Sequence, residues 1–358
     1  MPTPKVEMVI AAPDGTERTV AISSPDKPYF AELGLTKMDV VGYFQTVGDG
    51  ILAALRNRPT TMERWPGGWR EGATLSTRQD SGFGDAFYQK RVPKTAPDWV
   101  RTATITFPSG RTANEVCPTE LATVLWMANL GTLRFHPWPV SMTDTDRVDQ
   151  LRIDLDPQPG TDFADAVPAA YELRAVLADA GLTGFVKTSG GRGVHVFVPV
   201  QPRWEFVDAR HAVIALGREL ERRMPDQVTT HWWKEERGER IFVDFNQMAR
   251  DRTIASAYSI RPGPQARVSA PLEWDELGDV TPDDFSVITM LDRFADRGDV
   301  WKPFYSCDPG ELTIALEWYD RDERDGVGGE MPYPPEYPKM PGKPLRVQPS
   351  RKANAERE

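Results

Sequence analysis

Cysteine and histidine are scarce in this chain of 358 residues, which has two cysteines and four histidines. Cys117 and Cys307 cannot build a disulfide framework, and the histidines show no zinc-binding spacing. No apolar run approaches the roughly 20 residues of a membrane-spanning helix, and no basic leader with an apolar stretch opens the chain. These absences predict a reduced globular protein of the cytoplasm that is neither exported nor inserted in a membrane.

An excess of basic residues is also missing, because 43 Lys and Arg face 53 Asp and Glu, for a net charge of −10. That sign argues against a protein that binds nucleic acid over its whole surface. The acidic residues are unevenly spread, since residues 271–300 hold nine acids and only two bases. Most of the net charge therefore belongs to one segment, and a locally basic binding surface elsewhere is compatible with the composition.

Two aspartates one residue apart, Asp154 and Asp156, lie in an alternating segment at residues 151–156. In an extended strand residues i and i+2 share a face, so both carboxylates point one way while the apolar residues face a core. Paired carboxylates repel unless a cation neutralises them, and hard oxygen ligands suit Mg²⁺ or Mn²⁺. The pattern predicts a metal site on a strand; the alternative is a strand edge with solvated acids.

A third acid, Asp244, lies in the short apolar segment 241–245, which predicts a second strand. An acid among such neighbours is costly unless it is paired or bound to metal. A third carboxylate is what two metal ions about 4 Å apart need to be held together. The alternative is an ion pair between Asp244 and one of the nearby arginines.

A glycine-rich turn between two strands of residues 185–200 adds a candidate anion site. Its glycines permit positive φ and let backbone N–H groups converge on an anion. A strand follows these glycines, so the turn is not a dinucleotide-binding fingerprint, and it lacks the Gly-Lys-Ser/Thr of a P-loop. The alternative is an ordinary hairpin with a packed histidine. Beside three acids we favour a triphosphate cradle built from Ser189, Gly190, Arg192, Gly193 and His195.

Together these motifs resemble the three motifs of archaeo-eukaryotic primase-polymerases. More narrowly, residues from about 7 to 277 are similar to the polymerase domain of bacterial ligase D, which serves non-homologous end joining. Linking phrases carry the resemblance as well: Arg64-Trp65-Pro66, Gln89-Lys90-Arg91-Val92-Pro93, Asn114-Glu115-Val116-Cys117-Pro118, Asn246-Gln247-Met248-Ala249-Arg250-Asp251-Arg252-Thr253 and Ala257-Tyr258-Ser259-Ile260-Arg261.

The resemblance implies a role for each motif. Asp154, Asp156 and Asp244 would hold two ions, Mn²⁺ or Mg²⁺, that activate a primer 3′-hydroxyl and stabilise the leaving pyrophosphate. The glycine turn would grip the incoming NTP or dNTP, Arg261 would meet a phosphate, and Gln247 would help place the nucleotide. The family often favours ribonucleotides, and no residue here decides that preference.

A second group of residues concerns the nucleic acid. Thr36 with Asp39 is typical of a helix N-terminus, and a lysine there is a natural phosphate site. The resemblance implies that Lys27 and Lys37 bind the 5′-phosphate on the far side of a gap or break in DNA. The alternative is a pair of solvated surface lysines. The family commonly has asparagine where Ser24 stands.

Aromatic and basic side chains combine in one further segment, which suits stacking on bases beside neutralisation of the backbone. The alternative is the edge of a core. The polar stretch 70–82 predicts either an insertion near the DNA or a plain surface loop. The candidate stacking and backbone residues are Phe87, Tyr88, Lys90 and Arg91.

The chain mixes strands and helices without regular βαβ alternation, which predicts an α+β fold with antiparallel sheets flanked by helices. We expect helices at about 36–56, 119–130, 162–180, 207–224 and 311–319. The family fold implies an RRM-like palm beside a mixed N-terminal lobe. We expect a catalytic domain at residues 1–315, with lobes at about 1–140 and 141–315, and an acidic, then proline-rich tail at 316–358.

The sequence thus favours a stand-alone, template-directed nucleotidyltransferase that fills short gaps or ends in DNA repair, near the nucleoid. Its expected partners are gapped or broken DNA with a 5′-phosphate, nucleoside triphosphates and a separate DNA ligase that seals the product. One alternative is a two-metal phosphodiesterase or nuclease, which uses the same carboxylates. The other is a non-catalytic module that bridges DNA ends.

Overall fold

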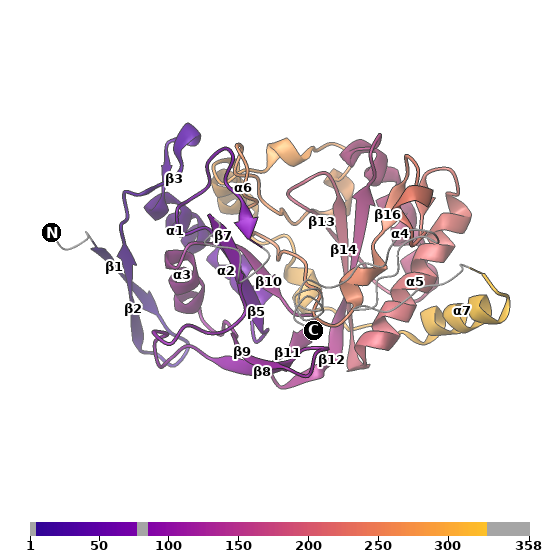
Figure 1. Cartoon of the computed structure of the whole chain (residues 1–358), viewed down its shortest axis with the longest axis horizontal. Coiled ribbons are helices and arrows are strands. Elements are labelled where there is room, and N and C mark those ends of the chain that lie inside the picture. The colour runs from indigo at the N-terminus through magenta and orange to yellow at the C-terminus, as the bar shows by residue number, and fades with distance from the viewer. Residues whose placement is uncertain (1–4, 77–84, 328–358) are drawn as a thin grey trace, which may run out of the picture.

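The computed structural model describes residues 5–76 and 85–327, and its main features are two mixed sheets with helices packed against them (Figure 1). One hydrophobic core runs through both halves. Residues 77–82 of the predicted 70–82 loop and the proline-rich part of the predicted tail lie outside the described residues.

The second sheet has the strand order β13-β14-β12-β16-β15, and β11 pairs with β12. Apart from the two-residue strands β11 and β15, its elements follow the pattern strand, helix, two strands, helix, strand, which is the split βαβ arrangement of RRM-like folds. The predicted α+β palm is therefore present. The elements are β11 (Val140–Ser141), β12 (Asp144–Pro157), α4 (Phe163–Asp179), β13 (Phe185–Thr188), β14 (Val194–Trp204), α5 (Phe206–Arg223), β15 (Val228–Thr229) and β16 (Ile241–Val243).

One face of this sheet is closed by helices α4 and α5, which pack on β12 and on each other (Figure 1). The alternation in β12 explains this choice of face, because Leu151, Ile153 and Leu155 are fully buried. Helix α4 begins at a capping box formed by Asp162 and Asp165. The opposite face, which carries the aspartates of β12, is turned toward the first half of the molecule.

The first half is built on a sheet of order β6-β7-β5-β9-β8, with β10 added beside β5. Helices α1 to α3 pack on one another and against this sheet and the separate ribbon β1-β2. Its elements are β1 (Lys5–Ala11), β2 (Glu17–Ser23), β3 (Pro28–Phe30), β4 (Leu35–Thr36), α1 (Lys37–Thr46), α2 (Gly48–Leu55), β5 (Thr60–Arg64), β6 (Leu75–Ser76), β7 (Ala86–Gln89), β8 (Thr102–Thr106), β9 (Thr112–Val116), α3 (Leu121–Asn129) and β10 (Thr132–Pro137).

Two predicted elements differ from the structure. The helix expected at 36–56 is two helices, α1 and α2, that meet at Val47, because Gly48 and Gly50 favour helix weakly and let the chain approach neighbouring side chains closely. The strand expected at 241–245 ends at Val243. Asp244 instead caps the 3-10 helix η3 (Phe245–Met248) and accepts a hydrogen bond from the backbone N–H of Asn246, which competes with the strand conformation.

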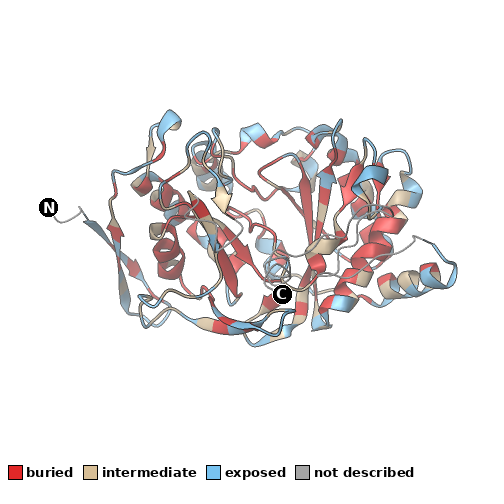
Figure 2. Ribbon diagram, viewed as in Figure 1, coloured by how far each residue is buried: buried red, intermediate tan, exposed pale blue. Residues whose placement is uncertain are grey.

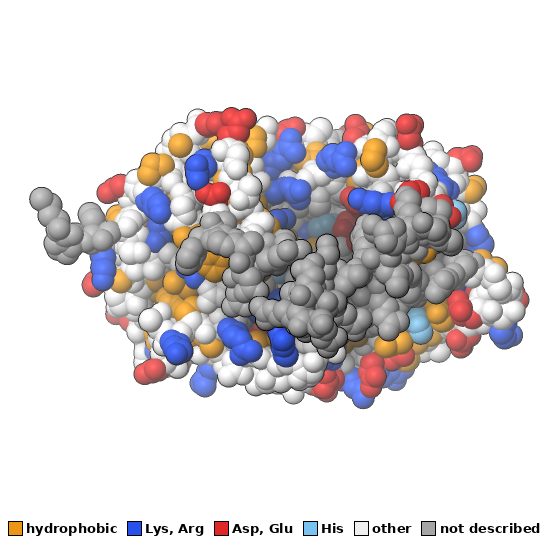
Figure 3. Space-filling model, viewed as in Figure 1, with side chains coloured by type: hydrophobic (Ala, Val, Ile, Leu, Met, Phe, Trp, Pro, Cys, Tyr) orange, Lys and Arg blue, Asp and Glu red, His pale blue; other side chains and the backbone are white. Residues whose placement is uncertain are grey.

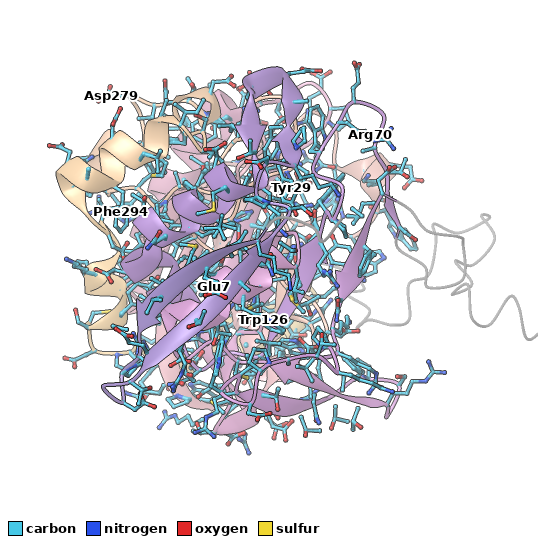
Figure 4. The ribbon with its side chains drawn as sticks, turned by 90° about the vertical axis from the view of Figure 1, so that its left-hand side faces the viewer. Glu7, Tyr29, Arg70, Trp126, Asp279 and Phe294 are labelled. Atoms are coloured by element: carbon cyan, nitrogen blue, oxygen red, sulfur yellow. The ribbon has the colours of Figure 1, made fainter. Side chains whose placement is uncertain are left out.

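After η3 the chain returns between the two sheets and joins them. Residues 256–260 hydrogen-bond to β10 of the first sheet, and residues 270–272 hydrogen-bond to β13 of the second. Helix α6 (Thr289–Arg297) then packs beside α1, and Figure 4 shows its Phe294 near the helices of the first half. Residues that follow the second sheet in the sequence therefore pack against the first half of the molecule. We keep a boundary near residue 140 as a prediction.

The last described helix, α7 (Thr313–Arg324), packs on α5 and contains the predicted tail boundary at residue 315. Its outer face is mostly exposed, whereas the strands of both sheets and the inner face of α5 are buried (Figure 2). No helix among the described residues is both long and apolar enough to span a bilayer. Further short 3-10 helices are Ala31–Leu33, Lys234–Glu236, Trp274–Glu276, Pro282–Asp284 and Lys302–Tyr305.

Candidate active site

A row of polar side chains crosses the open face of the second sheet. The register places His195 of β14 directly opposite both Lys187 of β13 and Asp154 of β12. Asp244, the first residue after β16, continues the row, because its backbone N–H donates to the carbonyl of Asp154 at 2.8 Å. Residues directly opposite each other in antiparallel strands point to the same face. Asp156, two residues beyond Asp154, points to that face as well.

The three aspartates share a repulsive environment. Burial raises the pKa of Asp154 to about 6, and burial together with the charge of Asp154 raises the pKa of Asp244 to about 6. Partial desolvation and Asp154 also raise the pKa of Asp156, although its side chain is the most exposed of the three. Among the described residues, none of the three forms an ion pair with lysine or arginine. The alternative of an Asp244–arginine pair is therefore not what the structure has.

Neutral groups take the place of a cation at these carboxylates. Asp244 accepts from the side-chain amide of Gln247 at 2.8 Å, and Asp156 accepts from the amide of Gln158 at 3.0 Å. The Nε2 atom of His195 lies 3.4 Å from Asp154 Oδ1. Within the described part of the chain, no three His, Cys, Asp or Glu side chains stand in a ready metal-holding arrangement. The donor chemistry still fits a hard divalent ion, because three oxygen donors lack a cationic partner.

The glycine turn is organised by its serine. Ser189 Oγ accepts from the backbone N–H groups of Gly191 and Gly193, at 3.0 and 3.1 Å. These two N–H groups therefore point at the hydroxyl, and the expected convergence of free N–H groups is replaced by a local side-chain turn. Among the turn glycines only Gly190 has positive φ, at 72°. Arg192 is exposed, and its guanidinium donates to the carbonyl of Pro157 at 3.3 Å.

Arg261 completes the rim of this turn. A Cβ on Gly191 would stand 2.7 Å from a guanidinium nitrogen of Arg261, so the guanidinium lies directly against the turn and would have to shift if a side chain were added there. The Arg261 side chain reaches the surface, but the surrounding protein partly desolvates it, and this desolvation and then the charge of Arg134 lower its pKa. Figure 3 shows Lys and Arg side chains gathered over the middle of this face, with histidine and acidic side chains deeper between them. The arrangement suits a bound anion above the aspartates.

The two predicted phosphate-binding lysines lie together at the start of α1. The Thr36–Asp39 capping box is present, and the backbone N–H of Lys37 donates to the carbonyl of Lys27 at 2.8 Å. Lys37 is buried, and burial, followed by the charges of Lys27 and Arg64, lowers its pKa to about 8. No carboxylate within the described residues pairs with any of these three cations.

Arg64 was not predicted as a site residue, although the phrase Arg64-Trp65-Pro66 was part of the family resemblance. Its guanidinium donates to the carbonyl of Leu130 at 2.7 Å and to the side-chain amide of Gln89. The sequence separates Arg64 from Lys37 by 26 residues, and only the pairing of strand β5 brings it to the lysines. The charge of Arg64 acts to lower the pKa of Lys37 and that of Tyr29.

The side chains of the four candidate stacking residues do not lie on one surface. Phe87 and Tyr88 are consecutive in β7 and so point to opposite faces. The guanidinium of Arg64 lies 5.1 Å from the Phe87 ring, whereas the Tyr88 ring packs edge-on to His136 at 5.5 Å. Lys90 is paired with Asp251, which offsets its charge. Arg91 is exposed and donates to the carbonyl of Thr112 at 2.6 Å.

An RRM-like sheet whose open face carries three acids, a serine-capped glycine turn and flanking arginines defines a palm of the primase-polymerase class. Residues 36–301 match the family described as LigD, primase-polymerase domain, and the chain belongs to that family.

Similar proteins agree with this assignment. The chain is 30% identical over 334 residues to the multifunctional non-homologous end joining protein LigD of Mycolicibacterium smegmatis, covering 91% of this chain and 41% of that protein. It is 32% identical over 296 residues to the bifunctional LigD of Bacillus subtilis, covering 82% and 45%. The chain thus spans less than half of each relative. A solved polymerase domain of Mycobacterium tuberculosis Ligase D in complex with DNA has a TM-score of 0.71 and 29% identity, covering 81% of this chain and 99% of that one.

Proposed function

We propose that this protein is a metal-dependent, DNA-directed nucleotidyltransferase that fills short gaps or extends ends during the repair of broken DNA. The proposal is carried by the row of three aspartates, which have no lysine or arginine partner among the described residues, beside an anion site lined by arginines. A polymerase needs carboxylates for divalent ions and cations for a triphosphate within one site. Membership of the LigD primase-polymerase family, and a structural neighbour bound to DNA, support the same reaction class.

Each side chain then has a defined task. Asp154, Asp156 and Asp244 would hold two Mg²⁺ or Mn²⁺ ions, which lower the pKa of a primer 3′-hydroxyl and stabilise the leaving pyrophosphate. Gln247 already orients the Asp244 carboxylate through a hydrogen bond. His195 lies 3.4 Å from Asp154 and Arg261 lies against the glycine turn, so both side chains would meet the incoming triphosphate.

The downstream part of the substrate is the finer part of this proposal. Lys27, Lys37 and Arg64 form a cluster at the N-terminus of α1, where the helix dipole also favours an anion, and no carboxylate in the described part of the chain pairs with them. A 5′-phosphate across a gap is an anion that this cluster suits. We expect the protein to act at the nucleoid in the cytoplasm, with nucleoside triphosphates, ribonucleotides included, as co-substrates. A DNA ligase would then seal the product.

The first test is extension of a labelled primer on a short gap that carries a downstream 5′-phosphate. Each ribonucleotide and deoxynucleotide is supplied separately with Mg²⁺ or Mn²⁺. We expect templated addition that disappears with chelator and in Asp156→Ala, because a hard ion loses an oxygen ligand there.

Other outcomes identify the alternatives. Shortening of the primer instead of growth would assign the site to a nuclease. Tight gap binding with no chemistry, unchanged in Asp156→Ala, would leave a module that bridges DNA ends. Lys5→Met, an exposed change on β1, serves as the control and should extend primers as the wild type does.

A further inference from the structure

Lys187 is a buried lysine without an acidic partner. It lies in β13, is fully buried, and forms no ion pair among the described residues. Its neighbours are neutral acceptors: Ser269 Oγ, the carbonyl of Thr188 at 3.4 Å and His195 Nδ1 at 2.8 Å. Burying an amine is costly, so a structural reason alone would favour an apolar residue here.

The hydrogen-bond inventory around Lys187 decides which nitrogen of His195 carries the proton. Ser269 Oγ donates its single proton to the carbonyl of Thr188 at 2.8 Å, so it presents a lone pair to Lys187 Nζ. That carbonyl can only accept. The lysine therefore donates to both, and as an ammonium it still has one N–H for His195 Nδ1. A neutral amine has only two N–H groups, and after donating them to Ser269 Oγ and Thr188 it would accept a hydrogen bond from Nδ1–H instead.

With Lys187 as the ammonium, His195 Nδ1 is the third acceptor, and the proton of the neutral ring lies on Nε2. That nitrogen is on the opposite side of the ring, 3.4 Å from Asp154 Oδ1. The ring is held in place by β14 and by Phe197, whose ring is stacked at 6.5 Å. The N–H of Nε2 therefore points into the space above the aspartates.

We propose that Lys187 is a positioning residue that fixes the Nε2-protonated tautomer of His195, so that this imidazole donates a hydrogen bond to the triphosphate. The inference rests on the proposed function for the identity of the anion. Without Lys187, Nδ1 could carry the proton, and Nε2 would then present a lone pair to an anion and repel it. Asp154 lies at Nε2 and, as a carboxylate, favours the proton on that same nitrogen, so Lys187 and Asp154 act in the same sense from opposite sides of the ring.

The experiment reads the tautomer directly. Because the chain has only four histidines, ¹⁵N-labelled histidine gives a simple two-bond ¹H–¹⁵N spectrum, in which His195 is assigned by its loss in His195→Gln. We expect the Nε2–H pattern for His195 in the wild type. Lys187→Met, which keeps the stem and removes the donors, should shift His195 toward the Nδ1–H form. Lys187→Arg retains a donor and should restore the wild-type pattern, and Lys5→Met should not change it.

Kinetics provide a second readout. Lys187→Met should lower kcat/KM for the nucleotide by about 10- to 100-fold, the range seen when the partner that orients a functional imidazole is removed. In a His195→Ala background the same change should cost nothing further. Full additivity of the two losses would overturn the proposal.

The wild-type spectrum tests the idea even if Lys187→Met does not fold, since an Nδ1–H pattern there would refute it. The spectrum also does not depend on polymerase activity. An Nε2–H tautomer that Lys187 controls, in a protein that extends no primer, would uphold the positioning and reject only the triphosphate.

Discussion

Asp154 and Asp244 are two carboxylates that the backbone holds together, since an amide of one bonds the carbonyl of the other. Their raised pKa values mean that the folded protein prefers their protonated form more than the unfolded chain does. The stability that results is fully present below the unfolded value of 3.8 and is lost as the pH rises through about 6. In the absence of metal, the aspartates therefore destabilise the protein at neutral pH.

Asp244→Asn should remove most of the repulsion. Without metal at pH 8, we expect the free energy of unfolding of the variant to be about 1–3 kcal/mol higher than that of the wild type, since one pKa unit corresponds to roughly 1.4 kcal/mol. The gain should shrink at pH 5, where the wild-type carboxyls are largely protonated.

Urea unfolding with chelator at the two pH values measures this gain. Adding Mg²⁺ or Mn²⁺ should stabilise the wild type more than the variant. A variant less stable than the wild type at pH 8 would show that the carboxylate serves the fold, through its cap on η3, more than it serves a metal.

At the scale of elements, the helix pair α1–α2 shows how two glycines in similar positions differ. A Cβ at Gly50 of α2 would stand 2.4 Å from the ring of Tyr258 and 3.1 Å from that of Phe294, whereas at Gly42 of α1 nothing lies within 4 Å. Tyr258 has positive φ, donates to Asp299 at 2.6 Å, and lies three residues before Arg261. Helix α2 thus supports the backbone that leads to the anion site.

Gly50→Ala should therefore destabilise the protein by about 1–3 kcal/mol, the usual cost of overpacking, and should raise the nucleotide KM by displacing the Tyr258–Arg261 segment. Gly42→Ala is the matched control and should stabilise α1 by up to about 1 kcal/mol, because alanine favours helix. Thermal unfolding and nucleotide titration of primer extension measure both. Equal behaviour of the two variants would remove the proposed link between α2 and Arg261.

Sequence patterns predict single strands and helices better than their pairing. The alternation around Asp154 was enough to place both acids of β12 on one face, and residues 36–39 were enough to predict the start of α1. The motifs already grouped Asp154, Asp244 and His195, but the place of Lys187 beside them was not visible, since it depends on the register of β13 against β14. The conversion of the Ser189 hydroxyl into a cap for Gly191 and Gly193 was also missed, because it depends on rotamer and turn geometry.

For the molecule as a whole, a net charge of −10 is compatible with DNA binding because the charges are segregated. In the acidic segment 271–300, Glu273 and Glu276 are paired with Arg297, and Glu276 also with Arg293. The cationic cluster of Lys27, Lys37 and Arg64 is not offset by acids in this way. Binding should therefore come from a few phosphate contacts and not from the overall field.

A double variant tests this view, because the effect should depend on one phosphate. Lys27→Met with Lys37→Met should weaken binding to a gap with a 5′-phosphate by about 1.5–3 kcal/mol, the scale of a hydrogen bond to a charged group. The dependence of log affinity on log salt should become shallower by about one for each lysine that contacts a phosphate. Fluorescence anisotropy at several salt concentrations, with and without the phosphate, measures both effects. The gap that lacks the phosphate should be bound almost equally by wild type and variant, since the cluster then has no anion to hold. Equal losses on both DNAs would assign the lysines to general attraction, and the 5′-phosphate would then need another site.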